Sequence, residues 1–401
     1  MLPFARFIAA LAVVVVAATA VFATACSNDG EDQPAPSVEL TDRPMSAEDE
    51  GAVDAAVEST IGESFGPAVH VGIWDPAKGF LEKAYGDAVR GSTPATVDDT
   101  FRIGSISKSF TATVILLLVD DGKLSLDDTI EDAAPGLAGK YPEVADRTIE
   151  QLLGMTSGIT DYLNVPDGLV KQISENPDTE RSADDLIEAG IAGGIEPAGT
   201  EGYSTTNYIL LQEIAEEITG ESLPDLIQAR IAKPLGLTGT RLPATGSEGL
   251  PEPFTHGYLN ELCVEEFEQA GGTATAGADT TDWNISYGQG GGSMHSNLHE
   301  LGVFAASSVG SALLSDDLAS RRVETTAEIG GGRSYGLGVF RVGDWIGHSG
   351  EALGWEALAL YNPETKVTMV MAVNSCAGGE INMRTIGNIL YPDTGLMDGL
   401  F

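Results

Sequence analysis

Four consecutive residues place a serine and a lysine three positions apart, directly before a strongly apolar segment. They are Ser105-Ile106-Ser107-Lys108, and the apolar segment spans residues 110–119. A serine hydroxyl is a weak nucleophile until a neighbouring base takes its proton. Residues i and i+3 share one face of a helix, so Lys108 would reach the Ser105 hydroxyl if both belong to the first turn. The spacing predicts nucleophilic catalysis by Ser105, although the bare motif also recurs by chance.

The position of this pair before a buried helix suits the chemistry. The amino end of a helix favours the negative charge that develops during nucleophilic attack. A lysine partly buried beside an apolar helix has a lowered pKa and can act as a neutral base. We therefore expect Lys108 to accept the proton of Ser105.

Five sequence blocks follow one another between about residues 65 and 390. They are residues 101–112 (FRIGSISKSFTA), 151–159 (QLLGMTSGI), 197–208 (PAGTEGYSTTNY), 291–294 (GGSM) and 348–350 (HSG). Each block is weak alone, but their order and spacing resemble the serine β-lactamase-like family. The branch is that of the class C β-lactamases and the Streptomyces-type D-alanyl-D-alanine carboxypeptidases.

The resemblance implies a reaction through an acyl-enzyme. Ser105 would attack an amide carbonyl, and Lys108, Tyr203 or both would take its proton. Tyr203 would then pass a proton to the leaving amine. A tyrosine shares this task only if nearby cations lower its pKa, and Lys108 and His348 could do so. His348 would also orient the network and help to hold a substrate carboxylate.

The resemblance also implies which groups surround the reacting carbonyl. The family's oxyanion hole uses two backbone N–H groups, which by position belong to Ser105 and Glu351. Thr205, Ser349 and Gly350 would contact the substrate. The small molecule expected there is a peptide or a β-lactam, and no cofactor is implied.

One position departs from the family. Its Tyr-x-Asn block reads Tyr203-Ser204-Thr205 here, and the flanking Asn207-Tyr208 fixes the register, so Asn207 is not a shifted replacement. A threonine keeps a hydroxyl that donates or accepts, but it lacks the reach of the amide. The substitution leaves substrate choice and turnover open.

These residues leave several functions in competition. The leading one is D-alanyl-D-alanine carboxypeptidase activity in the cell envelope, because His348 occupies the position where β-lactamases of the family often have lysine. A class C-like β-lactamase and an esterase of the same fold are the enzymatic alternatives. A penicillin- or peptide-binding sensor without turnover is the non-enzymatic one, and Thr205 motivates it.

The elements that must position these residues are segregated along the chain. Strand patterns cover residues 67–75 and 80–85 near one end and 355–361 and 367–374 near the other. Helical patterns cover residues 110–119, 207–218 and 297–306 between them. This arrangement predicts an α+β fold, with an antiparallel sheet built from both chain ends packed against helices and an all-helical subdomain between.

The amino-terminal 60 residues have a different character. Residues 1–26 combine Arg6, an apolar run and small residues before Cys26, which predicts a lipoprotein-type signal peptide with lipidation of Cys26. Residues 27–60 carry ten acidic residues and one basic residue, which predicts an acidic tether, with a helix starting near Ala47. Residues 61–401 would form the hydrolase domain, anchored outside the cytoplasmic membrane or secreted. The oligomeric state is left open.

Export would place the two remaining cysteines in an oxidising compartment. Cys263 and Cys376 are therefore expected to form a disulfide, with two free buried thiols as the alternative. Their spacing is not a metal motif. His295 and His299 lie four apart, but no third ligand accompanies them, so no metal site is expected.

The formal net charge of −39 comes from 60 acidic and 21 basic residues. Nucleic-acid binding needs a basic surface, so this balance argues against it. Most of the acidity lies on the predicted hydrolase domain, where it would repel anionic substrates at long range and raise the pKa of Lys108. Local burial would have to outweigh that effect.

Overall fold

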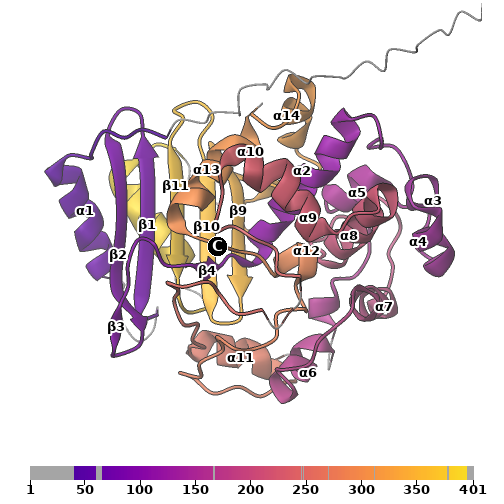
Figure 1. The fold of residues 1–401 in the computed structure, drawn as a ribbon, viewed down its shortest axis with the longest axis horizontal. Coiled ribbons are helices and arrows are strands. Elements are labelled where there is room, and N and C mark those ends of the chain that lie inside the picture. Colours follow the sequence, from indigo (N-terminus) through magenta and orange to yellow (C-terminus); the bar gives the residue numbers. More distant parts are fainter. Residues whose placement is uncertain are drawn as a thin grey trace, which may run out of the picture. The chain divides into compact units, whose positions relative to one another are not determined.

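Nine strands form one antiparallel sheet in the computed structural model of the chain (Figure 1). Their order is β3-β2-β1-β11-β10-β9-β8-β7-β6. The first long strands are β1 (Ala68–Asp75) and β2 (Gly79–Val89), and the last are β9 (Trp345–Ala352), β10 (Trp355–Tyr361) and β11 (Thr368–Val373). The short strands are β3 (Thr93–Pro94), β6 (Ala327–Glu328), β7 (Ser334–Tyr335) and β8 (Phe340–Val342).

The structure describes residues 40–59, 66–165, 168–244, 246, 248–269, 271–310, 312–376 and 379–394. All of them belong to one compact unit, Pro36–Phe401. The predicted signal peptide, Cys26 and the first part of the predicted tether lie outside the described residues. Among the helices that the structure describes, none has the length and apolar character needed to cross a membrane.

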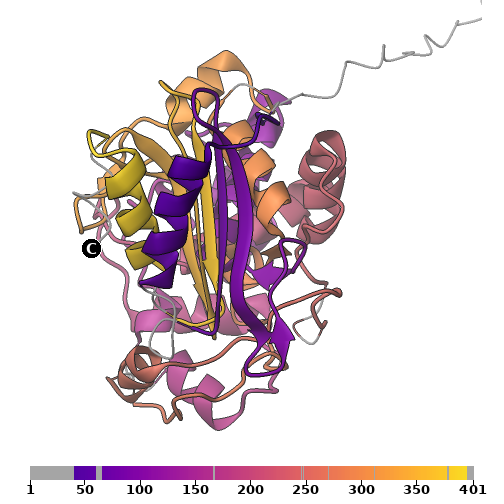
Figure 2. The ribbon, with the colours of Figure 1, turned by 90° about the vertical axis from the view of Figure 1, so that its left-hand side faces the viewer.

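A strand from near the start of the fold and a strand from near its end pair at the centre of the sheet. β1 pairs with β11 in the register Val69↔Val373 to Trp74↔Thr368. All eight residues of β1 are buried, because helices cover both faces of the sheet. Helices α1 (Ala47–Glu58) and α15 (Gly379–Leu390) cover one face and α13 (Leu298–Val309) the other (Figure 2). The predicted α+β architecture is confirmed.

The amino-terminal helix falls within the stretch predicted as tether. Ser46 caps α1 by accepting a hydrogen bond from the backbone N–H of Asp49. The helix buries Val53, Ala56 and Val57 and packs against α15. The helix predicted from Ala47 is confirmed, and this part of the acidic segment is packed on the fold.

A helical layer occupies the middle of the chain. Its centre is α2 (Ser107–Asp120), which is buried over most of its length and packs against α8 (Thr206–Thr219). The other helical elements are α3 (Ile130–Ala133), α4 (Pro135–Lys140), α5 (Ile149–Leu153), η2 (Tyr162–Asn164), α6 (Leu169–Glu175), α7 (Ala183–Gly193), α9 (Leu223–Ile227), η3 (Gln228–Ala232), α10 (Lys233–Leu235), α11 (Glu261–Gln269), α12 (Gln289–Gly292) and α14 (Asp316–Arg322). A two-stranded sheet of β4 (Phe101–Arg102) and β5 (His295–Ser296) joins this layer to the large sheet.

A disulfide joins Cys263 of α11 to Cys376, which follows β11, with 6.0 Å between the two Cα atoms. Leu259 and Phe267 pack with the two cysteines in a small apolar cluster. The pairing is the one proposed from the sequence. It ties a long connecting segment to the end of a central strand.

Candidate active site

Ser105 lies on a single 3₁₀ turn, η1 (Gly104–Ile106), which continues directly into α2. The next serine secures this turn. The Ser107 hydroxyl donates to the Gly104 carbonyl at 2.6 Å and accepts from the backbone N–H of Met294 at 3.1 Å. Ser105 therefore sits at the amino end of a buried helix, as the motif predicts.

Two glycines let strand β9 approach the nucleophile. Gly104 has a φ of 47°, in the region that favours glycine, and a Cβ there would stand 2.4 Å from the Glu351 carbonyl oxygen. A Cβ on Gly350 would stand 2.7 Å from the backbone nitrogen of Ser105. The backbones of η1 and β9 are thus in direct contact, which brings together the two residues expected to form the oxyanion hole.

Lys108 is completely buried below the serine. Its Nζ donates to Ser105 Oγ at 3.0 Å and to the Gly291 carbonyl oxygen at 2.8 Å. Burial lowers the pKa of Lys108 to about 7, and the negative charge of Asp161 opposes this shift. Near neutral pH a large fraction of the lysine is therefore a neutral amine, able to take the proton of Ser105.

Tyr203 lies beside Lys108, whose Nζ is 4.9 Å from the centre of the tyrosine ring. Burial raises the pKa of Tyr203 far above its usual value, although a hydrogen bond with Ser105 acts in the opposite direction. The condition for Tyr203 to act as a base, a pKa lowered by neighbouring cations, is not met, because desolvation of the phenolate outweighs their effect. Tyr203 is a neutral phenol that can relay a proton, with Lys108 as the better base.

His348 is buried on β9 and is 3% exposed. Its Nδ1 lies 2.5 Å from the Ser349 carbonyl oxygen, which can only accept, so Nδ1 carries the proton. Its Nε2 then accepts from the Tyr335 hydroxyl at 2.9 Å. Burial, together with the positive charge of Lys108 and nearby arginines, lowers the pKa of His348 to about 3.

A neutral His348 corrects one expectation, because it supplies no cation to lower the pKa of Tyr203. The physical reason is that no carboxylate of the described residues pairs with the imidazole, whereas its protonation would place a second cation beside Lys108. Its ring packs against Tyr203, with 6.3 Å between the ring centroids, so it remains an orienting member of the network.

Thr205, which departs from the family pattern, forms a hydrogen bond with a carboxylate that the sequence did not reveal. Thr205 is 2% exposed, and its hydroxyl donates to Oδ2 of Asp161 at 3.1 Å. Asp161 is 5% exposed. Asn207 does not replace the missing amide, because its side chain bonds Ser157 and the carbonyl of Leu152. Asp161 follows the block at residues 151–159, but nothing in its local pattern indicated a position near Lys108.

A cleft of about 250 Å³ opens above these groups. Ser349 and Glu351 line it from alternate positions of β9, and Arg333 lines it from the turn before β7. The remaining lining residues are Ser105, Tyr203, Ile329, Phe340, His348 and Gly350. Arg333 was not singled out from the sequence, because it lies in a glycine-rich turn outside the five sequence blocks.

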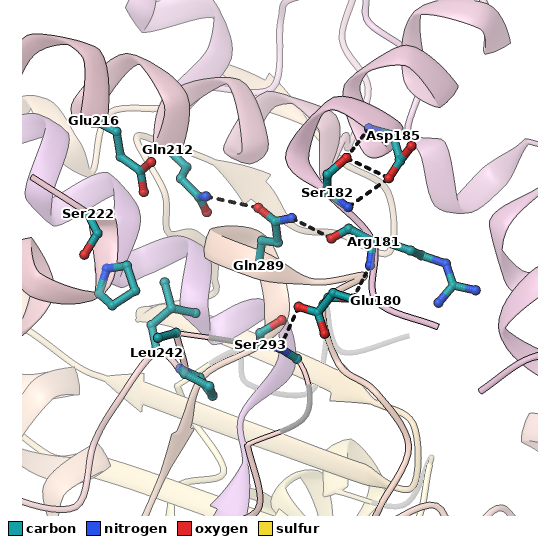
Figure 3. A pocket seen from close by; sticks show the side chains of 15 residues that line it. Glu180, Arg181, Ser182, Asp185, Gln212, Glu216, Ser222, Leu242, Gln289 and Ser293 are labelled. Atoms are coloured by element: carbon teal, nitrogen blue, oxygen red, sulfur yellow. Dashed lines mark hydrogen bonds between the residues drawn. The ribbon is translucent and has the colours of Figure 1, made fainter. Parts of the chain in front are cut away.

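A larger cavity of about 560 Å³ lies elsewhere and does not include the serine (Figure 3). Gln289 and Ser293 of the α12 region line it. There Gln212 donates to Gln289 at 3.0 Å, and its carbonyl accepts from the backbone N–H of Gly290 at 2.9 Å. These hydrogen bonds stabilise the turn at residues 289 and 290. The following residue, Gly291, accepts the hydrogen bond from Lys108. Within the described part of the chain, no group of three or more His, Cys, Asp or Glu residues is placed to hold a metal ion.

The fold and the site together define a serine hydrolase of the β-lactamase and penicillin-binding protein class. The family model described as "Beta-lactamase" matches residues 53–386. The chain therefore belongs to the β-lactamase family.

Two curated relatives cover part of the chain. Penicillin-binding protein 4 of Amycolatopsis lactamdurans is 35% identical over 167 residues, which are 40% of this chain and 39% of that protein. Penicillin-binding protein 4* of Bacillus subtilis is 33% identical over 179 residues, which are 43% of this chain and 38% of that protein. The match thus spans about two fifths of each relative.

Solved structures match far more of the fold. A D-stereospecific amidohydrolase from Streptomyces sp. has a TM-score of 0.71 and 25% identity, and the match covers 85% of this chain and 98% of that one. A penicillin-binding protein from Bacillus halodurans has a TM-score of 0.69 at 19% identity, covering 84% of this chain and 99% of that one. The second likeness shows the fold alone.

Proposed function

We propose that this protein is a cell-envelope serine hydrolase that forms an acyl-enzyme on Ser105 and acts as a D-alanyl-D-alanine carboxypeptidase. The observation that carries the proposal is the contact of 3.0 Å between Lys108 Nζ and Ser105 Oγ. Because Lys108 is fully buried, its pKa falls to about 7, and a large fraction of the amine is unprotonated near neutral pH. A nucleophile with an adjacent unprotonated base is what acylation requires.

The acylation step follows from this geometry. Lys108 takes the hydroxyl proton as Ser105 Oγ bonds to the substrate carbonyl carbon. The oxyanion so formed lies between the N–H groups of Ser105 and Glu351. Lys108 passes the hydroxyl proton to Tyr203 as Tyr203 donates its own to the amine nitrogen, so both residues regain their starting protonation while the C–N bond breaks and the amine leaves. Water then attacks the ester along the reverse proton path and frees Ser105.

Among the described residues that line the cleft, Arg333 carries the positive charge. Arg333 lines the cleft beside Ser105, whereas His348 is neutral. A guanidinium binds a carboxylate through two parallel hydrogen bonds. A peptide that ends in D-alanine would present its terminal carboxylate to this group. Arg333 therefore takes the role in carboxylate binding that the sequence had given to His348.

Glu351 favours a second candidate. Its side chain is exposed and lines the same cleft. A carboxylate there would attract a free amino group, such as that of an amino-acid amide. The structural likeness to a D-stereospecific amidohydrolase supports this alternative, in which the bond cleaved is a terminal amide.

A labelling experiment tests the shared chemistry. The protein is incubated with a fluorescent penicillin and its intact mass is measured, beside Ser105→Ala. We expect one adduct on the wild type and none on the variant. No adduct with penicillin or with a reactive ester, or an equal adduct on Ser105→Ala, would refute an acyl-enzyme on this serine.

A substrate panel then separates the candidates. It contains an acyl-D-Ala-D-Ala peptide, nitrocefin, a short-chain nitrophenyl ester and a D-amino-acid amide. Release of D-alanine over many turnovers supports the carboxypeptidase, and preference for the amide supports the alternative. Labelling without turnover on every substrate would indicate the binding sensor suggested by Thr205.

The proposed place of action rests on the amino-terminal sequence. Cys26 would carry a lipid, and the acidic tether would hold the hydrolase away from the membrane. Metabolic labelling with a fatty-acid analogue should mark the wild type and not Cys26→Ala, and the variant should leave the membrane fraction. Labelling that survives the substitution would remove the lipid anchor from the proposal.

A further inference from the structure

We propose that Asp161 is a positioning residue for the reaction. Its carboxylate is held by a hydrogen bond with Thr205, places a negative charge beside Lys108, and so controls the pH at which the lysine becomes a base. The inference deepens the proposed function and rests on Lys108 acting as that base.

Asp161 is fixed by two hydrogen bonds. Its Oδ1 accepts from the backbone N–H of Leu163 at 3.0 Å, which caps the turn η2, and its Oδ2 accepts from the Thr205 hydroxyl at 3.1 Å. Both Asp161 and Thr205 are at least 95% buried. A carboxylate enclosed in this way cannot turn toward solvent, so its charge acts on its neighbours.

Thr205 links this carboxylate to the lysine. Its Cγ2 packs so closely against Gly291 that a Cβ on the glycine would stand 2.7 Å away. The carbonyl of the same glycine accepts from Lys108 Nζ at 2.8 Å. Thr205 thus contacts the residue that holds the lysine and also orients the carboxylate that acts on it.

Among the described residues, Asp161 is the carboxylate whose charge acts on Lys108. The other groups near the lysine are Tyr203 before α8, Tyr208 in α8, Tyr335 on β7, His348 on β9, Arg322 at the end of α14 and Arg333 in the turn before β7. Burial keeps the three tyrosines and His348 neutral, and the arginines are cationic. Asp161 raises the pKa of Lys108, but burial lowers this pKa by a larger amount.

The pairing accounts for the threonine that stands in place of the family's asparagine. A hydroxyl can donate to Asp161 while its methyl group packs on Gly291. An anionic partner stabilises a buried ammonium, and so it moves the change of charge of Lys108 toward neutral pH. In this protein a hydroxyl bonded to a buried carboxylate stands at the position of the family's amide.

Asp161→Asn isolates the charge. The amide oxygen can still cap η2, and the Thr205 hydroxyl can accept from the amide nitrogen instead of donating. Asp75→Asn is the matched control: Asp75 is also buried, accepts from the backbone N–H of Ala77, and accepts from the Tyr391 hydroxyl at 2.9 Å on the far side of the sheet. Thr205→Ser keeps the hydroxyl and serves as the conservative variant.

Two readouts are taken on each variant. One is the pH profile of the acylation rate with a nitrophenyl ester, and the other is the NMR titration of Lys108 in lysine-labelled protein, assigned with Lys108→Arg. In Asp161→Asn we expect both midpoints to fall by about one pH unit or more, the usual effect of an adjacent opposite charge. Thr205→Ser and Asp75→Asn should leave both midpoints in place.

Unchanged midpoints in folded Asp161→Asn would overturn the inference, as would an equal shift in Asp75→Asn. The two readouts separate this failure from failure of the proposed function. If no substrate acylates the wild type, the NMR titration still reports whether Asp161 acts on Lys108. If acylation proceeds and the midpoints do not move, only the role of Asp161 is lost.

Discussion

Gly350 and Ser105 are in backbone contact: a methyl group on the glycine would stand 2.7 Å from the nitrogen of the serine. It would also stand 1.9 Å from the carbonyl oxygen of Ile103. Neither neighbour can yield easily, because both belong to the backbone that leads into α2. The position of the nucleophile relative to β9 therefore depends on the absence of a side chain at residue 350.

Gly350→Ala should consequently lower the rate of acylation sharply. Separating the Ser105 turn from β9 displaces one N–H donor of the oxyanion hole, which costs on the order of a hundredfold in rate. Stopped-flow acylation with a fluorescent penicillin measures the effect, and circular dichroism checks the fold. A folded variant that retains the wild-type rate would contradict the proposed oxyanion hole.

The rate of acylation should depend on pH through Lys108. The pKa of this lysine is lowered from 10.5 to about 7, and only the unprotonated amine can take a proton. The rate should therefore rise about tenfold per pH unit below pH 7 and level off above it. A profile with its midpoint near pH 10 would show that the lysine is charged at neutral pH and is not the base.

The same shift predicts a trend in stability. Between the folded pKa of about 7 and the unfolded value near 10.5, the unfolded chain binds more protons at Lys108 than the folded chain does. The contribution of Lys108 to the free energy of unfolding should thus rise with pH across this window. Urea unfolding of the wild type and of Lys108→Met at pH 6.5 and 9.5 tests this trend. The amount by which the free energy of unfolding of Lys108→Met exceeds that of the wild type should be smaller at pH 9.5.

Removing the cation of Arg333 should affect substrates selectively. Arg333→Gln should raise KM for an acyl-D-Ala-D-Ala peptide by about tenfold or more, the value of one or two hydrogen bonds to a charged group. The nitrophenyl ester has no carboxylate and serves as the control. Equal losses on both substrates would indicate that Arg333 supports the structure of the cleft and does not bind the carboxylate.

The acidic surface predicts an effect of salt. The chain carries a net charge of −39, so an anionic peptide is repelled at long range. Between about 0.02 and 0.3 M salt, kcat/KM for such a peptide should rise, because ions screen the repulsion. The uncharged ester should show little change, and a peptide rate that falls with salt would mean that attraction to Arg333 dominates the encounter.

The disulfide should contribute to stability more than to chemistry. It closes a loop between residues 113 apart, and losing such a link costs about 2–5 kcal/mol. The double variant Cys263→Ser/Cys376→Ser should unfold at a lower temperature and still label on Ser105. Loss of labelling in a folded double variant would instead place the disulfide among the elements that shape the cleft.

Local pattern was enough for the elements that carry their own signals. The apolar run after Lys108 predicted α2, and the strand patterns at residues 355–361 and 367–374 predicted β10 and β11. The site residues Ser105, Lys108 and Tyr203 were found because each lies in a short motif with fixed neighbours. Arg333 and Asp161 were missed because neither belongs to such a motif.

The sequence by itself determined which groups can react: a serine with a lysine three residues later, a tyrosine, and a histidine in a His-Ser-Gly triplet. Only the tertiary structure decided their charge states. Protonation depends on the surroundings in three dimensions, and burial here made Tyr203 and His348 neutral against expectation. The threonine in the family's asparagine position gained its meaning in the same way, because its carboxylate partner lies 44 residues away along the chain.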